Sequence, residues 1–413
     1  MKKALSIFLS ILMILCSCTG FAATALANNF SSEIDIQKAL DKNKYDSSTP
    51  LTVTVEGTYI LSSRLVVYSN TTLNCEGATF IKNYQNSTML AIGQNQDAPY
   101  GKDFYKNITI NGGTFDANKN NGSILSFAHA SNITINGAGI YYKSINPKPN
   151  SKSQRPNTYK CSVKSYSPTV DKSSQISGNI ISIVDTKDSS MKQWPYGIRL
   201  YGEVIKSNEK IAKKGDYSVQ NITVSNNTIS VARSATGIWI DGAKKSNIKN
   251  NKITFTNKKY KTKQKVFGIR LANSNKVNLN KNTVNVKGVP YVDNAIFLIK
   301  SKSNTLTSNK TTGARLHGIY LTQGSSATIN KCTVSSNKSD GIYITKSTAN
   351  IKNCTVSSNK GNGIYFVSKS KGSIKNCKIK KNKKKGIYIS SAAGKVSVSK
   401  IKYSGNKGGK IKK

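Results

Sequence analysis

Acidic residues are scarce in this 413-residue chain. Its 63 lysines and arginines outnumber 18 aspartates and glutamates, which gives a formal charge of +45 at neutral pH. No acidic residue follows Asp340, whereas 19 lysines do. A codon bias toward Lys, Asn, Ile and Tyr would enrich Asp and Glu as well, so it does not explain the imbalance. The charge therefore favours a polyanionic partner or surface.

Paired cysteines and long apolar runs are also lacking. Beyond the N-terminus no segment approaches the ~20 apolar residues that a membrane-spanning helix needs, so we expect no transmembrane segment. Five cysteines follow residue 27, and an odd number in so large a chain excludes a small disulfide-stapled scaffold. These are Cys75, Cys161, Cys332, Cys354 and Cys377.

The first 27 residues have the pattern of a signal peptide. Lys2 and Lys3 precede an apolar run, and Ala25-Leu26-Ala27 offers a small-residue cleavage site. Lipid attachment at Cys18 is the alternative. We expect a secreted or extracellular monomer, with association to the cell surface left open. An exported chain meets acidic polysaccharides and cell-wall polyanions rather than nucleic acid, so we expect such a polymer as partner and no nucleic acid.

A short phrase, Gly-Ile-x-(Ile/Leu), repeats through the second half of the chain, and from residue 295 onward its spacing is 22 or 23 residues. Each repeat holds two further short apolar runs, which predicts three strands per repeat and a parallel β-helix. We expect one such domain over residues 28–404, a basic tail over 405–413, and insertions at 141–175, 185–196 and 202–218. The phrase begins at Gly197, Gly237, Gly268, Gly318, Gly341, Gly363 and Gly386, with Ala295 in the slot between Gly268 and Gly318.

Two further patterns support stacked coils. One aligned column predicts a buried ladder of asparagine amides that cysteines continue as small buried side chains. Its members are Asn179, Asn227, Asn251, Asn282, Asn309, Cys332, Cys354, Cys377 and Ser399. Residues 32–40 predict a short capping helix, because Ser32 is followed by Asp35 and then by apolar Ile36, Ala39 and Leu40.

Several N-terminal stretches resemble the right-handed parallel β-helix proteins related to pectate lyases and polygalacturonases. They are Glu56-Gly57-Thr58-Tyr59, residues 68–73, Asn107-Ile108-Thr109-Ile110-Asn111-Gly112-Gly113-Thr114-Phe115-Asp116 and residues 126–135. The resemblance implies an all-β, right-handed coil over residues 33–404 and a link to acidic polysaccharides. It leaves the activity open, because that superfamily includes hydrolases, lyases, epimerases and non-catalytic binders.

The hydrolase motifs of polygalacturonases are absent. The chain has no Asp-Asp pair and no Gly-His-Gly, and its only histidines are His129 and His317. Since paired carboxylates perform glycoside hydrolysis, an enzyme of this sequence would instead be a lyase acting by β-elimination. Such a lyase needs a base and a group that neutralises the uronate charge. Our candidates are Arg199, Arg270 and Asp241.

The variable position x of the phrase predicts an outward-facing column of side chains. We expect substrate binding by Trp239, Tyr201, Phe297 and Tyr320, because rings stack on sugars and arginines grip carboxylates. The alternative is that stacked rings merely stabilise the sheet, which we favour for the four tyrosines. The column runs Arg199, Trp239, Arg270, Phe297, Tyr320, Tyr343, Tyr365 and Tyr388.

Acidic residues gather near the insertions. Asp185, Asp188 and Glu203 are candidate ligands for calcium, the one cofactor that the sequence suggests; the alternative is that they only neutralise nearby lysines. His317 is interpreted as a turn residue rather than a base.

Three hypotheses follow: a lyase for acidic polysaccharide, a non-catalytic binder of such a polymer or of the cell wall, and a purely structural rod.

Overall fold

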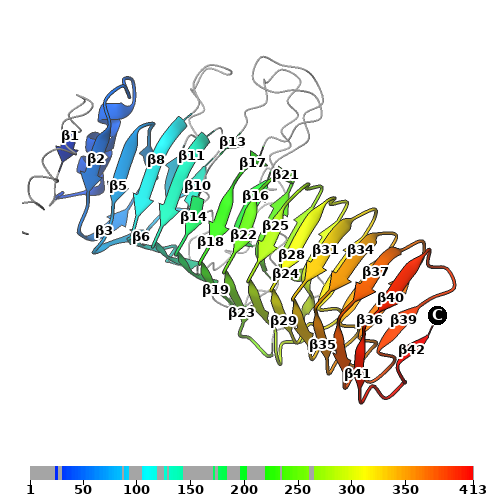
Figure 1. Ribbon diagram of the computed structural model, residues 1–413. Coiled ribbons are helices and arrows are strands. Elements are labelled where there is room, and N and C mark those ends of the chain that lie inside the picture. Colours follow the sequence, from blue (N-terminus) through cyan, green and yellow to red (C-terminus); the bar gives the residue numbers. More distant parts are fainter. Residues whose placement is uncertain are drawn as a thin grey trace, which may run out of the picture.

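The chain folds into a rod of stacked coils (Figure 1). The computed structural model describes residues 24–26, 30–85, 88–92, 105–118, 125–127, 130–142, 171–172, 175–183, 196–201, 219–232, 235–259 and 265–412. Most of the three predicted insertions, the first 23 residues and Cys161 lie outside them. Within the described residues, no helix has both the length and the apolar character required to cross a membrane.

From β16 onward each coil contributes one strand to each of three long parallel sheets, whereas the third strands of the earlier coils form a separate three-stranded sheet of β4 (Leu65–Val67), β7 (Leu90–Ile92) and β10 (Leu125–Phe127). This arrangement confirms the predicted parallel β-solenoid. The nine-stranded sheet carries the repeated phrase. Its strands are β16 (Tyr196–Tyr201), β20 (Thr236–Asp241), β24 (Val266–Ala272), β27 (Val292–Ile299), β30 (Ile319–Thr322), β33 (Ile342–Thr345), β36 (Ile364–Val367), β39 (Ile387–Ile389) and β42 (Ile411–Lys412).

The other two long sheets form the remaining sides of the coil. The fourteen-stranded sheet comprises β1 (Thr24–Leu26), β2 (Leu51–Thr54), β5 (Thr71–Asn74), β8 (Tyr105–Asn111), β11 (Ala130–Asn136), β14 (Gln175–Ser177), β18 (Thr223–Ser225), β22 (Asn247–Lys249), β25 (Asn278–Asn280), β28 (Asn304–Thr307), β31 (Ser326–Asn330), β34 (Thr348–Lys352), β37 (Lys371–Lys375) and β40 (Val396–Ser399). The thirteen-stranded sheet comprises β3 (Gly57–Leu61), β6 (Ala78–Lys82), β9 (Thr114–Asp116), β12 (Gly139–Tyr142), β15 (Ile180–Ile183), β19 (Thr228–Val231), β23 (Lys252–Phe255), β26 (Thr283–Asn285), β29 (Lys310–Thr312), β32 (Thr333–Ser335), β35 (Thr355–Ser357), β38 (Lys378–Lys380) and β41 (Lys402–Ser404).

The glycine of the repeated phrase is required by close approach between coils. A Cβ atom on Gly341 would lie 2.4 Å from Val356 Cγ1 and 2.6 Å from the carbonyl oxygen of Gly363 in the next coil. The two apolar residues of each phrase face the core, as Ile342 and Ile344 illustrate with no exposed surface. The phrase therefore marks a strand whose glycine packs closely against the next coil and whose two apolar side chains lie in the core.

The predicted amide ladder is present, with one correction. Asn251 Nδ2 donates to Asn282 Oδ1 at 2.9 Å, and the same bond links each neighbouring pair from Asn179 to Asn309. The buried thiols of Cys332, Cys354 and Cys377 continue the column. Placing Ser399 next was wrong, since the pairing of Lys378 with Lys402 puts Ile401 beside Cys377.

A second buried amide ladder escaped the sequence analysis. It runs through Asn337, Asn359, Asn382 and Asn406, and each side-chain amide donates to the next at 2.8 Å. The Asn359 oxygen also accepts the backbone N–H of Asn337 at 3.1 Å. Each amide thus bonds to the adjacent coil through both side chain and backbone, which fixes the register of the stack.

The N-terminal end is covered as predicted. Helix α2 (Glu33–Leu40) has Ser32 as its N-cap, whose hydroxyl accepts the backbone N–H of Asp35 at 3.4 Å. Its Ile36, Ala39 and Leu40 are buried in the first core cluster. At the other end, residues 405–413 were expected to be a tail, but β42 pairs with β39 and so carries the nine-stranded sheet to Lys412.

Candidate functional site

The outward column lies on the nine-stranded sheet in the register that the sequence predicts. Arg199 pairs with Trp239, Trp239 with Arg270, and Arg270 with Phe297. The pairing continues through Tyr320, Tyr343, Tyr365 and Tyr388. Since paired strands lie about 4.8 Å apart, these side chains form a continuous row along the rod.

The first members of the row are linked by cation–π and ring contacts that also include Tyr196. The guanidinium of Arg270 lies 3.9 Å from the centre of the Trp239 ring, and Tyr196 meets the same ring edge-on at 5.0 Å. The guanidinium of Arg199 lies 5.1 Å from the Tyr196 ring. Arg199 is exposed, whereas Trp239 and Arg270 are half-buried. We call these four residues together with Asp241 the arginine–aromatic cluster.

The carboxylate of Asp241 is already engaged. One oxygen accepts the Asn273 amide at 2.7 Å, and the other lies 3.7 Å from Arg270 Nη1. Both side chains of this ion pair are only 17% exposed. Burial lowers the pKa of Arg270, and the charge of Asp241 opposes that shift. Of the three candidate catalytic residues, Asp241 and Arg270 therefore hold each other, and Arg199 alone presents its cation to solvent.

The candidate binding residues have unequal access. Phe297 is 9% exposed because its ring stacks on Phe267 at 4.7 Å and contacts Tyr320 at 5.2 Å. Trp239 and Tyr320 are half-buried and reach the surface. Tyr201 lies opposite Asp241 on the neighbouring strand, but its side chain lies outside the described residues.

The metal prediction falls on residues that the structure does not describe. Asp185, Asp188 and Glu203 all lie outside the described ranges. In the part of the chain that is described, no three His, Cys, Asp or Glu side chains gather closely enough to hold a metal ion. The calcium site consequently remains a proposal.

Neighbouring tyrosine rings of the row contact one another, and only Tyr365 and Tyr388 are stacked in parallel. Ring centres lie 5.1 Å apart between Tyr320 and Tyr343, 5.4 Å between Tyr343 and Tyr365, and 4.6 Å between Tyr365 and Tyr388. Burial raises the pKa of both Tyr343 and Tyr365. These contacts support a stabilising role for the tyrosines. Their half-buried rings still form an apolar strip on the surface.

A polar row beside the tyrosines was missed by the sequence analysis. It occupies the position before the first residue of the phrase in four successive coils and consists of Asn294, His317, Asp340 and Asn362. His317 Nδ1 lies 3.4 Å from Asp340 Oδ2, and the His317 ring stacks on Tyr343 at 4.4 Å. Burial lowers the pKa of His317 to about 4 despite the Asp340 charge. His317 is therefore neutral at physiological pH. An alignment of the residues before each phrase, like the alignment of the x position, would have predicted this row.

Arg315 forms a second ion pair close to this row in the sequence, with Asp293. Its Nε donates to Asp293 Oδ1 at 2.9 Å, and its Nη2 bonds to the same oxygen. The Asp293 side chain is 5% exposed, whereas that of Arg315 is 48% exposed. The buried acid therefore fixes a guanidinium that still faces solvent.

Comparison with known proteins agrees with the fold. Residues 267–412 match the family model of the right handed beta helix region. The fold is thus a right-handed parallel β-helix, as the sequence predicts. No curated protein matches the chain by sequence.

Three solved structures illustrate the similarity. The A-module of the mannuronan C-5 epimerase AlgE4 from Azotobacter vinelandii is 11% identical, with 95% of this chain and 96% of that chain covered and a TM-score of 0.46. The surface protein and adhesin PfbA of Streptococcus pneumoniae is 15% identical, with 95% and 100% covered and a TM-score of 0.47. Tailspike protein 3 of bacteriophage CBA120 is 11% identical, with 93% and 60% covered and a TM-score of 0.45.

Proposed function

We propose that this chain binds an acidic polysaccharide lengthwise along the outward column of the nine-stranded sheet. The observation that carries the proposal is the register-locked row in which Arg199, Trp239 and Arg270 occupy successive strands. A guanidinium matches the geometry of a uronate carboxylate, and an aromatic face stacks on a sugar ring. The formal charge of +45 attracts any polyanion to the rod before these contacts form.

Within this proposal the cluster residues have different roles. Arg199 is the exposed cation and contacts a carboxylate of the polymer, and Trp239 is the stacking platform. Arg270 and Asp241 are positioning residues, because their ion pair and the 3.9 Å contact with the Trp239 ring hold that ring in place. Tyr320 and the tyrosines beyond it extend the platform.

Binding without cleavage is the reading that these contacts favour. A base must be free to accept a proton, and the Asp241 carboxylate is shared between Asn273 and Arg270. Cleavage by β-elimination remains the alternative, with Arg199 as its most exposed candidate residue. Both readings can be tested in one experiment.

The test combines co-sedimentation with the absorbance of unsaturated product. The purified protein is incubated with polygalacturonate, alginate or a glycosaminoglycan, with and without calcium. We expect sedimentation with at least one polymer and no product. The Arg199→Ala and Trp239→Ala variants should each weaken binding about tenfold, and Arg64→Ala, which removes an exposed arginine elsewhere on the rod, should not.

Two results would contradict this account. Product that disappears in Arg199→Ala would establish the lyase instead of the binder. Equal binding by wild type, Arg199→Ala and Arg64→Ala at low salt would mean that net charge alone attracts the polymer and that the outward column plays no part.

We also propose that the chain is exported and that residues 1–27 are removed, so that β1 is lost and β2 becomes the first strand of its sheet. The support is the basic start, the apolar run and Ala25-Leu26-Ala27. N-terminal sequencing of protein recovered from the culture medium should begin at Asn28. An acylated Cys18 at the N-terminus of a membrane-associated form would favour lipidation instead.

A further inference from the structure

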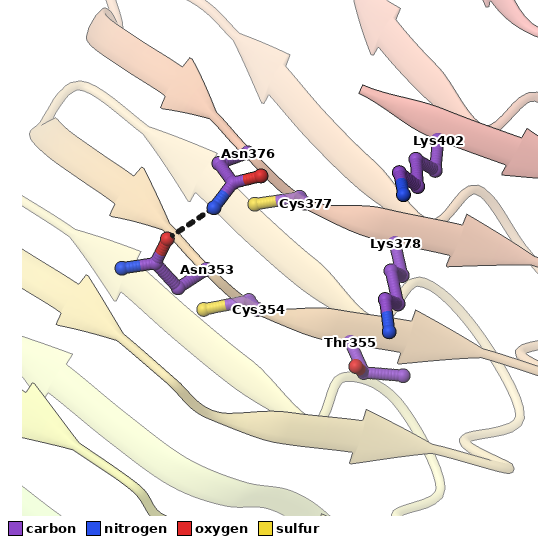
Figure 2. A pocket seen from close by; sticks show the side chains of 7 residues that line it. All are labelled: Asn353, Cys354, Thr355, Asn376, Cys377, Lys378 and Lys402. Carbon is purple, nitrogen blue, oxygen red and sulfur yellow. Dashed lines mark hydrogen bonds between the residues drawn. The ribbon is translucent and has the colours of Figure 1, made fainter. Parts of the chain in front are cut away.

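A hollow of about 220 Å³ lies near the C-terminal end of the rod, away from the nine-stranded sheet. It is lined by Asn353, Cys354, Thr355, Asn376, Cys377, Lys378 and Lys402. Figure 2 shows Thr355, Lys378 and Lys402 on three successive strands, with the two asparagines and two cysteines beside them. We call it the lysine hollow.

The two lysines of the hollow are held next to each other by the fold. Lys378 pairs with Lys402 across β38 and β41, and Thr355 precedes them in the same register on β35. Both lysines are exposed. Because no acidic residue follows Asp340 in the sequence, neither of their coils supplies an acidic side chain to separate the two charges. A bridging anion would relieve that repulsion.

Neutral donors complete the lining. The Asn376 amide donates one hydrogen to Asn353 Oδ1 at 2.7 Å, and the Asn353 amide donates one to Asn330 Oδ1 at 2.9 Å (Figure 2 draws the first bond). Each amide nitrogen carries a second hydrogen, and Thr355 adds a hydroxyl. Two ammonium groups, a hydroxyl and two amides are a donor set suited to an anion with several acceptor oxygens.

The lining favours phosphate over a uronate carboxylate. It contains no aromatic ring on which a sugar could stack. It also contains no arginine, and the last arginine of the chain is Arg315. Lysine binds phosphate as a point charge, whereas the two-pronged grip on a carboxylate belongs to arginine. The outward column thus offers arginines and aromatic rings, whereas the lysine hollow offers lysines as its only charged groups.

We propose that the lysine hollow is a second binding site, which takes the phosphate groups of a linear phosphate polymer. Neighbouring exposed lysines such as Lys380 and Lys375 give the same polymer further contacts outside the hollow. The site is independent of the outward column and of the polysaccharide proposed to bind there.

The column of Lys378 supplies matched substitutions. Thr333 and Thr355 occupy its position in the two preceding coils, so Lys378→Thr/Lys402→Thr uses a side chain that the coil already accepts. Lys252 and Lys310 lie in the same column, each next to threonine rather than lysine. The Lys252→Thr/Lys310→Thr variant therefore removes the same charge without breaking an adjacent pair.

Titration calorimetry at low ionic strength with inorganic polyphosphate tests the proposal, and circular dichroism verifies that each variant is folded. We expect Lys378→Thr/Lys402→Thr to weaken polyphosphate binding about tenfold and the control pair by about twofold or less. Equal weakening by both pairs, or no weakening by either, overturns the site. Polygalacturonate, titrated in parallel, should bind both variants within about twofold of wild type. Failure of wild type to bind any of polygalacturonate, alginate and a glycosaminoglycan would reject the proposed polysaccharide function and leave the polyphosphate result unaffected.

Discussion

Replacement of His317 by asparagine should make the protein less sensitive to acid. The imidazole is buried and its pKa is lowered to about 4, whereas histidine in an unfolded chain has a pKa near its ordinary value of 6.5. The unfolded state therefore binds the proton first as pH falls, and stability is lost between about 6.5 and 4. The difference of about 2.5 pKa units corresponds to about 3 kcal/mol in total and to about 2 kcal/mol at pH 5.

Asparagine is the appropriate replacement because the same row already contains Asn294 and Asn362. The Asn362 backbone and side chain donate to Asp340 Oδ1 at 2.6 and 3.0 Å, so the column accommodates an amide. Urea unfolding, followed by circular dichroism at pH 7 and pH 5, measures the free energy of unfolding. Wild type should lose about 2 kcal/mol more than His317→Asn between these pH values.

The remaining acids titrate in both proteins, so the difference between wild type and variant isolates His317. Nuclear magnetic resonance titration of a His129→Gln protein, in which His317 is the only histidine, provides a direct measurement. A pKa above 6 in that titration, or equal acid sensitivity of wild type and His317→Asn, would refute the description of His317 as a buried neutral group.

Three further predictions concern the packing of the coils and the candidate calcium ligands. Asn251→Ala removes the acceptor of the Asn227 backbone N–H and the donor to the Val224 carbonyl, so it should lower the free energy of unfolding in urea by about 3 kcal/mol. Asn251→Cys should lower it less, because cysteine occupies this column further along the rod. Equal losses for the two variants would contradict the ladder argument. Gly341→Ala should cost about 1–3 kcal/mol through overpacking against Val356, and a stabilised variant would show that the coil expands freely. Replacement of Asp185, Asp188 and Glu203 by alanine should abolish calcium binding in equilibrium dialysis, and unchanged binding would place the site elsewhere.

The repetition in the sequence was sufficient to predict the scaffold. Gly-Ile-x-(Ile/Leu) recurs at a nearly fixed spacing because every coil presents the same close approach at glycine and the same core on either side of it. One alignment consequently predicted the sheet, the outward column and the first amide ladder. It failed at Ser399, where the last coil is lengthened between β39 and β40 and the spacing no longer applies.

The contacts within the candidate site could not be predicted in the same way. Alignment placed Arg270 and Trp239 on neighbouring strands, but it did not indicate that Arg270 would lie on the Trp239 ring and pair with Asp241. Those contacts depend on side-chain conformation and on burial rather than on register. The contact between His317 and Asp340 was missed for a different reason, since only the x position of the phrase was followed along the stack.

The second amide ladder has a consequence for the length of the rod. Asn337, Asn359 and Asn382 are interchangeable, because each is bonded to an asparagine in the coil before it or after it. Deletion of the 22 residues from Asn337 through Ser358 would bring Asn359 to the place of Asn337, with its own amide partner Asn382 unchanged. The rod would shorten by one step of about 4.8 Å. Its reach along a bound polymer can therefore be altered in whole coils, one at a time.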